Sequence, residues 1–178
     1  LDLYIGIYKQ CRKKWQKMFK VIDNYLDEEQ HLNLKTVMES KNFPWFYTKG
    51  KVKSTDNPKL FDYQFTHIFY IRNNINSDFF NHLNPILDKL KPLSLIRIKA
   101  NLNPPTKNIV TSDYHTDQKF KCKIAVYYLN DNDGYTMIEK EKILSKKNRI
   151  VLFTSDSKHF GTTSTNCNNR MVINFNYF

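Results

Sequence analysis

The sequence predicts one α+β domain in which helices come first and a mostly β half follows. Apolar residues recur at helical spacing before residue 40, whereas β-branched, aliphatic and aromatic residues dominate from Leu93 onward. Turn-forming stretches at 130–134 and 146–148 separate the β segments. A chain of 178 residues is long enough for one domain with a substantial core. We therefore expect the β half to form a sandwich or barrel.

Helices are expected in the first half of the chain. Residues 1–20 carry an apolar stripe opposite a lysine-rich face, which predicts a basic amphipathic helix, part of or appended to a domain over residues 21–178. Packing of this helix across the domain is favoured over binding to a partner or a membrane. Asp27 can cap a second helix, Ser77 can cap a short helix through Leu83, and Asn84–Pro85 can open a further one.

Strands are expected where β-forming residues gather between turn signals. The last expected strand has two different faces, since Arg170, Val172, Asn174 and Asn176 alternate with Met171, Ile173, Phe175 and Tyr177. The expected strands cover residues 65–71, 93–102, 122–129, 135–139, 149–153 and 171–178.

Composition excludes some classes of protein and leaves others open. A net charge of +11 allows a polyanionic partner. Lysine and asparagine are nevertheless over-used together with isoleucine, tyrosine and phenylalanine, as in chains from AT-rich genomes, so a solvated basic surface is the favoured interpretation. No apolar run is long enough to cross a bilayer, so no membrane partner is expected. Cys11, Cys122 and Cys167 lack CxxC spacing, which favours a reducing cytoplasm.

A metal site is predicted from three residues. His115 and Asp117 are two positions apart, so in an extended segment both side chains point to the same face and can reach one ion. His159 follows a predicted strand and supplies a second imidazole. Two imidazoles and one carboxylate can form the facial triad that leaves coordination positions open on iron(II).

Arg170 extends this site toward a ligand. If the last strand is considered alone, its polar face is explained by contact with solvent. After a metal triad, the same face is better explained as the lining of a cavity, in which the planar guanidinium of Arg170 suits both oxygens of a carboxylate.

The order of these features resembles the prolyl-4-hydroxylase-like branch of the 2-oxoglutarate/iron(II) oxygenases, and within it compact phage-encoded members. That branch has His-x-Asp, a distal histidine and a basic residue shortly after it. Residues 124–130 resemble its strand after the first two ligands, and residues 148–156 resemble its approach to the distal histidine. Residues 21–26 resemble the entry segment of the branch.

The resemblance implies a double-stranded β-helix (jelly-roll) core with N-terminal helices packed on it. It also implies iron(II) on His115, Asp117 and His159, which would serve as the catalytic centre, with 2-oxoglutarate and O2 as co-substrates. Oxidative decarboxylation of 2-oxoglutarate to succinate and carbon dioxide would be coupled to hydroxylation of a C–H bond, in a prolyl or other residue of a protein or peptide. The expected location is the cytoplasm, of the host if the chain is phage-encoded.

The resemblance also assigns roles around the co-substrate. Tyr128 would help Arg170 bind the far carboxylate of 2-oxoglutarate, and Asn174 would lie near the same site. Asn176 stands where the branch often has a residue nearer the substrate. Many members carry a tyrosine on or just after the strand before His-x-Asp, and here Asn103 takes that place.

Two other functions stay open. One is a nucleic-acid demethylase of the same superfamily, but that branch has a second arginine six residues after the first, where this sequence has Asn176. The other is a non-catalytic metal-binding or virion-associated module, against which the complete triad and Arg170 weigh. A protein or peptide substrate is therefore favoured over nucleic acid, and the sequence does not determine the oligomeric state.

Overall fold

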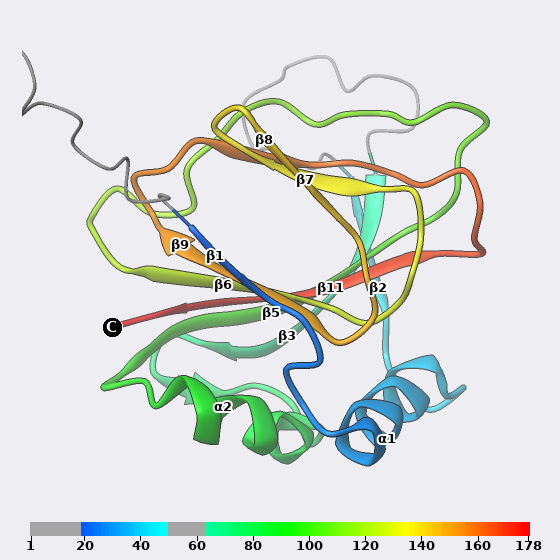
Figure 1. The fold of residues 1–178 in the computed structure, drawn as a ribbon. Helices are drawn as coiled ribbons and strands as arrows, with labels where there is room; N and C mark the ends of the chain where they lie inside the picture. Colours follow the sequence, from blue (N-terminus) through cyan, green and yellow to red (C-terminus); the bar gives the residue numbers. More distant parts are fainter. Residues whose placement is uncertain (1–18, 50–62) are drawn as a thin grey trace, which may run out of the picture.

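Two antiparallel sheets face each other, and two helices cover the outer side of the larger sheet (Figure 1). The structure, a computed structural model, describes residues 19–49 and 63–178. The larger sheet has the strand order β1-β9-β6-β11-β5-β3-β2 with β4 paired to β3, and the smaller has the order β10-β7-β8. The elements are β1 (Lys20–Ile22), α1 (Glu28–Glu39), β2 (Phe46–Lys49), β3 (Tyr63–Ile71), β4 (Asn74–Ile75), the 3-10 helix η1 (Phe80–Leu83), α2 (Asn84–Leu90), β5 (Leu95–Asn103), β6 (Lys123–Tyr128), β7 (Tyr135–Ile138), β8 (Glu141–Leu144), β9 (Arg149–Thr154), β10 (His159–Gly161) and β11 (Arg170–Tyr177).

This arrangement agrees with the expected α+β class and is compatible with a jelly-roll core. The six strands expected from sequence all form, with ends that differ by at most two residues. β1, β2, β4, β8 and β10 were not anticipated; each has only two to four residues, too few to show an alternating pattern.

The helices follow their local signals in most places. Asp27 caps α1, since its side chain accepts a hydrogen bond of 2.8 Å from the backbone N–H of Gln30. The prediction for Ser77 is wrong in detail, because η1 begins only at Phe80 and its N-cap is Phe79. α2 forms at Asn84–Pro85 as expected, but Leu83 rather than Asn84 is its N-cap.

The basic helix predicted for residues 1–20 lies outside the described residues except at its last two positions. Lys20 begins β1, which pairs with β9, so the helix does not extend to that residue. Among the described residues, no helix is both long and apolar enough to span a membrane.

The central strand β11 separates two environments. Its apolar face packs into the main core with side chains of α1 and α2, for example Leu34 and Ile86. Its polar face points between the two sheets, where Arg170 and Asn176 are buried. The residue alternation of this strand was therefore predicted correctly, and its polar face lines an interior, as expected for the strand that follows a metal triad.

Candidate functional site

His115 and His159 are brought together by the backbone as well as by their side chains. His159 lies on β10, and His115 lies on the connection between β5 and β6. Each residue donates its backbone N–H to the carbonyl of the other, with both N···O distances at 3.0 Å. Their ring centroids are 4.6 Å apart. This short bridge fixes two side chains that are far apart in sequence.

Both imidazoles are oriented so that one nitrogen is available. The Nδ1 atom of His115 is 3.1 Å from the carbonyl of Asp113, and that of His159 is 3.1 Å from the carbonyl of Ser157. A carbonyl can only accept, so Nδ1 carries the proton in each ring and Nε2 is left as a metal ligand. Burial lowers the pKa of His159, which favours the neutral ring that a metal needs.

Asp117 completes the group. Potential ligand atoms of His115, Asp117 and His159 all lie within 4.8 Å of one another. One carboxylate oxygen of Asp117, Oδ1, is 3.2 Å from Nη2 of Arg97 on β5. The other, Oδ2, is buried and has no hydrogen-bond partner among the described residues. An orphaned carboxylate oxygen beside two oriented imidazoles fits a bound cation.

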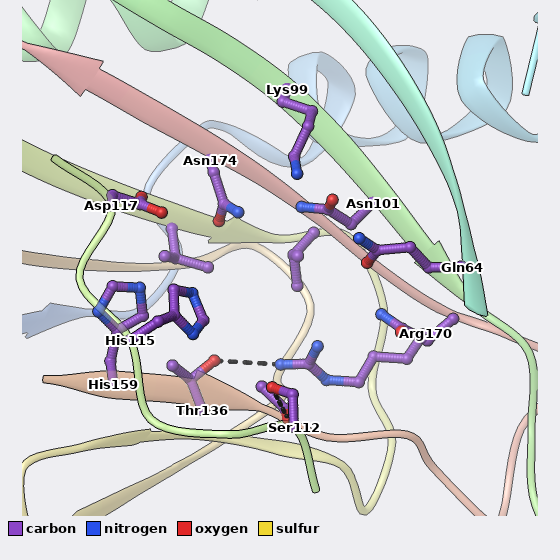
Figure 2. A pocket seen from close by; sticks show the side chains of 14 residues that line it. Gln64, Lys99, Asn101, Ser112, His115, Asp117, Thr136, His159, Arg170 and Asn174 are labelled. Carbon is purple, nitrogen blue, oxygen red and sulfur yellow. Dashed lines mark hydrogen bonds between the residues drawn. The ribbon is translucent and has the colours of Figure 1, made fainter. Parts of the chain in front are cut away.

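Arg170 stands at another corner of the same pocket (Figure 2). Its side chain is 2% exposed, and burial lowers its pKa. Its Nε donates to the hydroxyl of Ser145 at 2.9 Å, and Nη2 donates to the hydroxyl of Thr136 at 3.1 Å. Within the described part of the chain, no carboxylate pairs with this guanidinium. A fully desolvated cation of this kind fits an anionic ligand.

Two glycines leave room for this arrangement. A Cβ on Gly134 would lie 2.6 Å from Cδ of Arg170 and 2.7 Å from the carbonyl oxygen of Thr163, so only glycine fits there. A Cβ on Gly161 would lie 3.7 Å from Nη1 of Arg170, where it would fill space at the tip of the guanidinium. The pocket thus keeps a small open cradle beside the charged group.

The residues predicted near Arg170 differ in their placement. Tyr128 is fully buried, with its ring centroid 5.8 Å from Cζ of Arg170, and its hydroxyl makes no hydrogen bond among the described residues. Asn103 and Asn174 line the pocket. Asn176 does not line it; this residue is completely buried and its amide is also without a partner in the described chain.

Lys99 and Asn101 of the pocket lining, and Arg97, which pairs with Asp117, were not predicted from the sequence. Arg97, Lys99, Asn101 and Asn103 alternate along β5, in register with Asn176, Asn174, Val172 and Arg170 on β11. Burial lowers the pKa of Lys99 to about 8. The alternation of polar residues at 97, 99, 101 and 103 is the same signal as on the last strand, and it could have identified β5 as a second wall of the cavity.

Other contributors gave no usable signal. Thr136 on β7 and Gln64 on β3 also line the pocket, and Ser145 follows β8. Hydroxyl and amide residues are common in strands and turns, so their types alone do not indicate a site. Packing of the small sheet over the large one brings Thr136 and Ser145 to Arg170, whereas the pairing of β3 with β5 places Gln64 beside the pocket.

Comparison with known proteins identifies the fold. No protein-family model matches the sequence, and no curated protein matches it. A prolyl hydroxylase from Trichoplax adhaerens, solved in complex with a hypoxia inducible factor peptide fragment, has a TM-score of 0.61 at 16% identity, over 92% of this chain and 84% of that one. A 2OG-Fe(II) oxygenase family oxidoreductase from Burkholderia pseudomallei has a TM-score of 0.62 at 9% identity, over 91% and 85%. A Pseudomonas putida prolyl-4-hydroxylase has a TM-score of 0.58 at 12% identity, over 89% and 91%. The chain therefore has the fold of the 2-oxoglutarate/iron(II) oxygenases.

Proposed function

We propose that the protein is an iron(II)- and 2-oxoglutarate-dependent oxygenase that hydroxylates a residue of a protein or peptide. The observation that carries this proposal is a buried arginine without an anion, in the same pocket as a His-Asp-His group. A metal site alone would not need Arg170, and an arginine alone would not need the triad. Together they fit a ligand that has one end on the metal and a carboxylate at the other.

Each residue then has a role that its contacts support. His115 and His159 present Nε2 to the metal because backbone carbonyls hold their Nδ1 protons. Asp117 supplies the anionic ligand through Oδ2, while Arg97 holds its other oxygen. When bound, iron(II) and 2-oxoglutarate supply, with dioxygen, the oxidising chemistry that yields succinate, carbon dioxide and a hydroxylated product.

The far carboxylate of 2-oxoglutarate is assigned to Arg170. The guanidinium is oriented by Thr136 and Ser145, and the unpaired hydroxyl of Tyr128 lies beside it as a further donor. Charge-assisted bonds to a planar fork are both strong and directional. Asn174 lines the intervening wall, and Asn176 lies deeper than a residue that touches the substrate would.

A peptide substrate is supported by the comparisons. The Trichoplax adhaerens enzyme, which shares the fold, was solved with a peptide fragment bound. Nothing in the described residues adds support for nucleic acid beyond the net charge of +11. A prolyl or other residue of a protein is therefore the substrate that we propose to test first.

The test combines metal binding with turnover. Under anaerobic conditions we expect one iron(II) per chain, and loss of most binding in Asp117→Ala, which removes the only anionic ligand. Asp113→Ala is the matched control, because this carboxylate is exposed on the same connection and lies outside the ligand group. In air, the iron-loaded protein should convert 2-oxoglutarate to succinate and add the mass of one oxygen to a prolyl peptide. Iron binding that survives simultaneous loss of His115, Asp117 and His159 would show that the site is elsewhere.

A further inference from the structure

The pocket has a third charged corner that the proposed co-substrate does not use. Figure 2 shows the Lys99 side chain pointing into the pocket between Asn174 and Asn101, from the side opposite Arg170. Among the described residues, the ammonium of Lys99 forms no ion pair with a carboxylate. Lys99 is half-buried, so its ammonium is partly desolvated, and an anionic ligand in the pocket would offset that cost.

The acidic group that acts on Lys99 already has other partners. Asp117 attracts Lys99 electrostatically, but its carboxylate contacts Arg97 and forms part of the metal group. Arg97 and Lys99 share one face of β5, two residues apart, so a group bound at Lys99 would lie roughly 7 Å along the strand from the residue that holds Asp117. Lys99 is therefore close to the reacting centre.

The co-substrate does not account for Lys99 either. Arg170 pairs in register with Asn103, which is four residues from Lys99 on β5, or about 13 Å along the strand. 2-Oxoglutarate has two carboxylates, and the proposed function uses one at Arg170 and the other at the metal. A carboxylate that pairs with the ammonium of Lys99 would therefore come from a different molecule.

We propose that Lys99 is a specificity-determining residue whose ammonium binds a carboxylate of the substrate, located on the hydroxylated residue or on its immediate neighbour. This inference rests on the proposed function and narrows its substrate class to acidic peptides or amino acids. Asn101 and Asn174 flank the ammonium and supply amide donors for the same carboxylate. The carboxylate has two sources, an acidic side chain and a terminal α-carboxylate, which the experiment separates.

The experiment uses the iron-loaded protein with 2-oxoglutarate and three matched pairs of probes. The first pair is a capped peptide in which proline is next to glutamate or next to glutamine. The second is a peptide that ends in proline with a free or an amidated terminus, and the third is L-proline against L-prolinamide. The same pairs are repeated with each other amino acid in the reacting position. Oxidation is read by mass, and kcat/KM is compared within each pair.

We expect the acidic member of at least one pair to be favoured roughly 10- to 100-fold by the parent protein. Lys99→Met, which keeps the length of the side chain, should bring that ratio near one. Lys99→Glu should reverse the preference, so that a peptide with lysine next to the reacting residue is favoured over one with glutamate there. This variant gives a readout even if Lys99→Met only slows the reaction. The control is Lys140→Met, an exposed lysine outside the pocket, which should retain the parent ratio.

Several outcomes would overturn the inference. It is wrong if the parent favours the neutral members, oxidises a methylated oligonucleotide instead, or oxidises no acidic probe. It is also wrong if Lys99→Met weakens 2-oxoglutarate binding by more than about twofold, because Lys99 would then serve the co-substrate. Failure of the proposed function has a different signature, since the parent would then bind neither iron(II) nor 2-oxoglutarate.

Discussion

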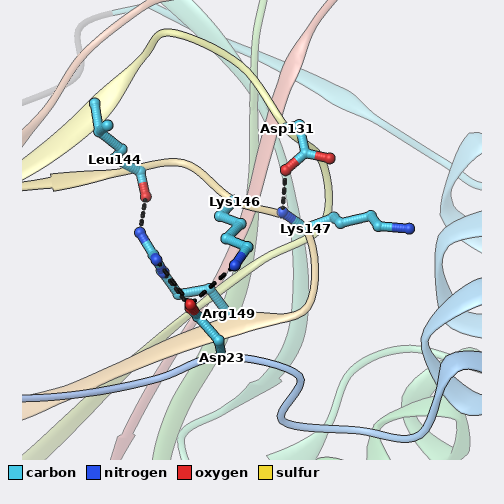
Figure 3. A network of polar contacts seen from close by, with 6 residues as sticks. All are labelled: Asp23, Asp131, Leu144, Lys146, Lys147 and Arg149. Carbon is cyan, nitrogen blue, oxygen red and sulfur yellow. Dashed lines mark hydrogen bonds and ion pairs between the residues drawn. The ribbon is translucent and has the colours of Figure 1, made fainter.

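Two arginines of the larger sheet illustrate opposite uses of the same side chain. Arg149, at the start of β9, pairs with Asp23, with Nε–Oδ1 at 2.6 Å and Nη2–Oδ2 at 3.1 Å (Figure 3). Arg170, at the start of β11, has only hydroxyl partners and no carboxylate among the described residues. The hydrogen bond with Asp23 raises the pKa of Arg149, whereas burial lowers that of Arg170.

The difference separates a structural arginine from a ligand-binding one. Arg149 and Asp23 lie partly in solvent, where a complete ion pair joins the segment after β1 to β9 and needs nothing else. The guanidinium of Arg170 is already desolvated in the folded protein. The free-energy cost of removing its water therefore arises on folding and not when a carboxylate binds. A buried guanidinium that has no carboxylate partner among the described residues therefore indicates a carboxylate that comes from a ligand.

The largest expected effect that tests the difference between Arg149 and Arg170 is a loss of affinity for 2-oxoglutarate. Arg170→Ala should weaken binding by roughly two orders of magnitude, since a charge-assisted bidentate pair is lost. Arg170→Lys should recover only part of the affinity because an ammonium cannot reproduce the fork. The measurement is an anaerobic titration of iron-loaded protein that follows the metal-to-ligand charge-transfer band.

The matched control is the same chemical change at the other arginine. Arg149→Lys should leave 2-oxoglutarate affinity at the parent value, and all three variants should bind iron(II) normally because neither arginine is a ligand. If Arg170→Ala binds 2-oxoglutarate as well as the parent does, the distinction between the two arginines fails and with it the co-substrate assignment.

An intermediate effect is expected from Thr136, whose hydroxyl orients Nη2 of Arg170. Thr136→Val keeps the shape of the side chain and removes one hydrogen bond, so 2-oxoglutarate affinity should fall by roughly 5-fold, or about 1 kcal/mol. Thr48→Val is the control, because its hydroxyl bonds to that of Thr66 at 2.9 Å and lies outside the pocket lining. Equal affinities for the Thr136 variant and the parent would mean that the guanidinium does not depend on this contact.

The smallest effect concerns stability. Asp23→Asn should lower the free energy of unfolding by less than about 1 kcal/mol at neutral pH, because the pair is partly exposed and screened. The hydrogen bond from Arg149 is the main cause that lowers the pKa of Asp23 from 3.8 to about 2. A carboxyl whose pKa is lowered in the folded state stabilises the fold when the pH is above its ordinary, unfolded-state pKa. This contribution is lost as the pH falls toward the pKa of the folded state.

Denaturant unfolding between pH 7 and pH 2 measures this prediction. The difference in free energy of unfolding between the parent and Asp23→Asn should be present at pH 7 and should disappear between about pH 4 and pH 2. A gap that is independent of pH would mean that Asp23 acts by its shape or its neutral hydrogen bonds and not by its charge.

The parts of the candidate site that depend on residues close together in the sequence were predicted better than the parts that depend on residues far apart in it. His115 and Asp117 were paired by a spacing of two residues, and Arg170 by its place on an alternating strand. Their meeting with His159 depends on the backbone bridge between His115 and His159, which joins residues 44 apart in the sequence. The partners Arg97 and Lys99 come from β5 and Thr136 comes from β7, and the sequence does not show that these two strands meet at the triad.

By itself the sequence determined the class of fold, the main strands and the types of ligand atom, because these depend on side-chain periodicity and on residue chemistry. The tertiary structure determined that the polar face of β11 lies between the two sheets and not in solvent. The large sheet buries the apolar face of β11 under α1 and α2, and the small sheet encloses the polar face, so Arg170 loses its water without gaining an anion. That unbalanced charge arises only when two sheets pack face to face, which is why sequence could suggest the carboxylate site and only the packed structure could show its need for a ligand.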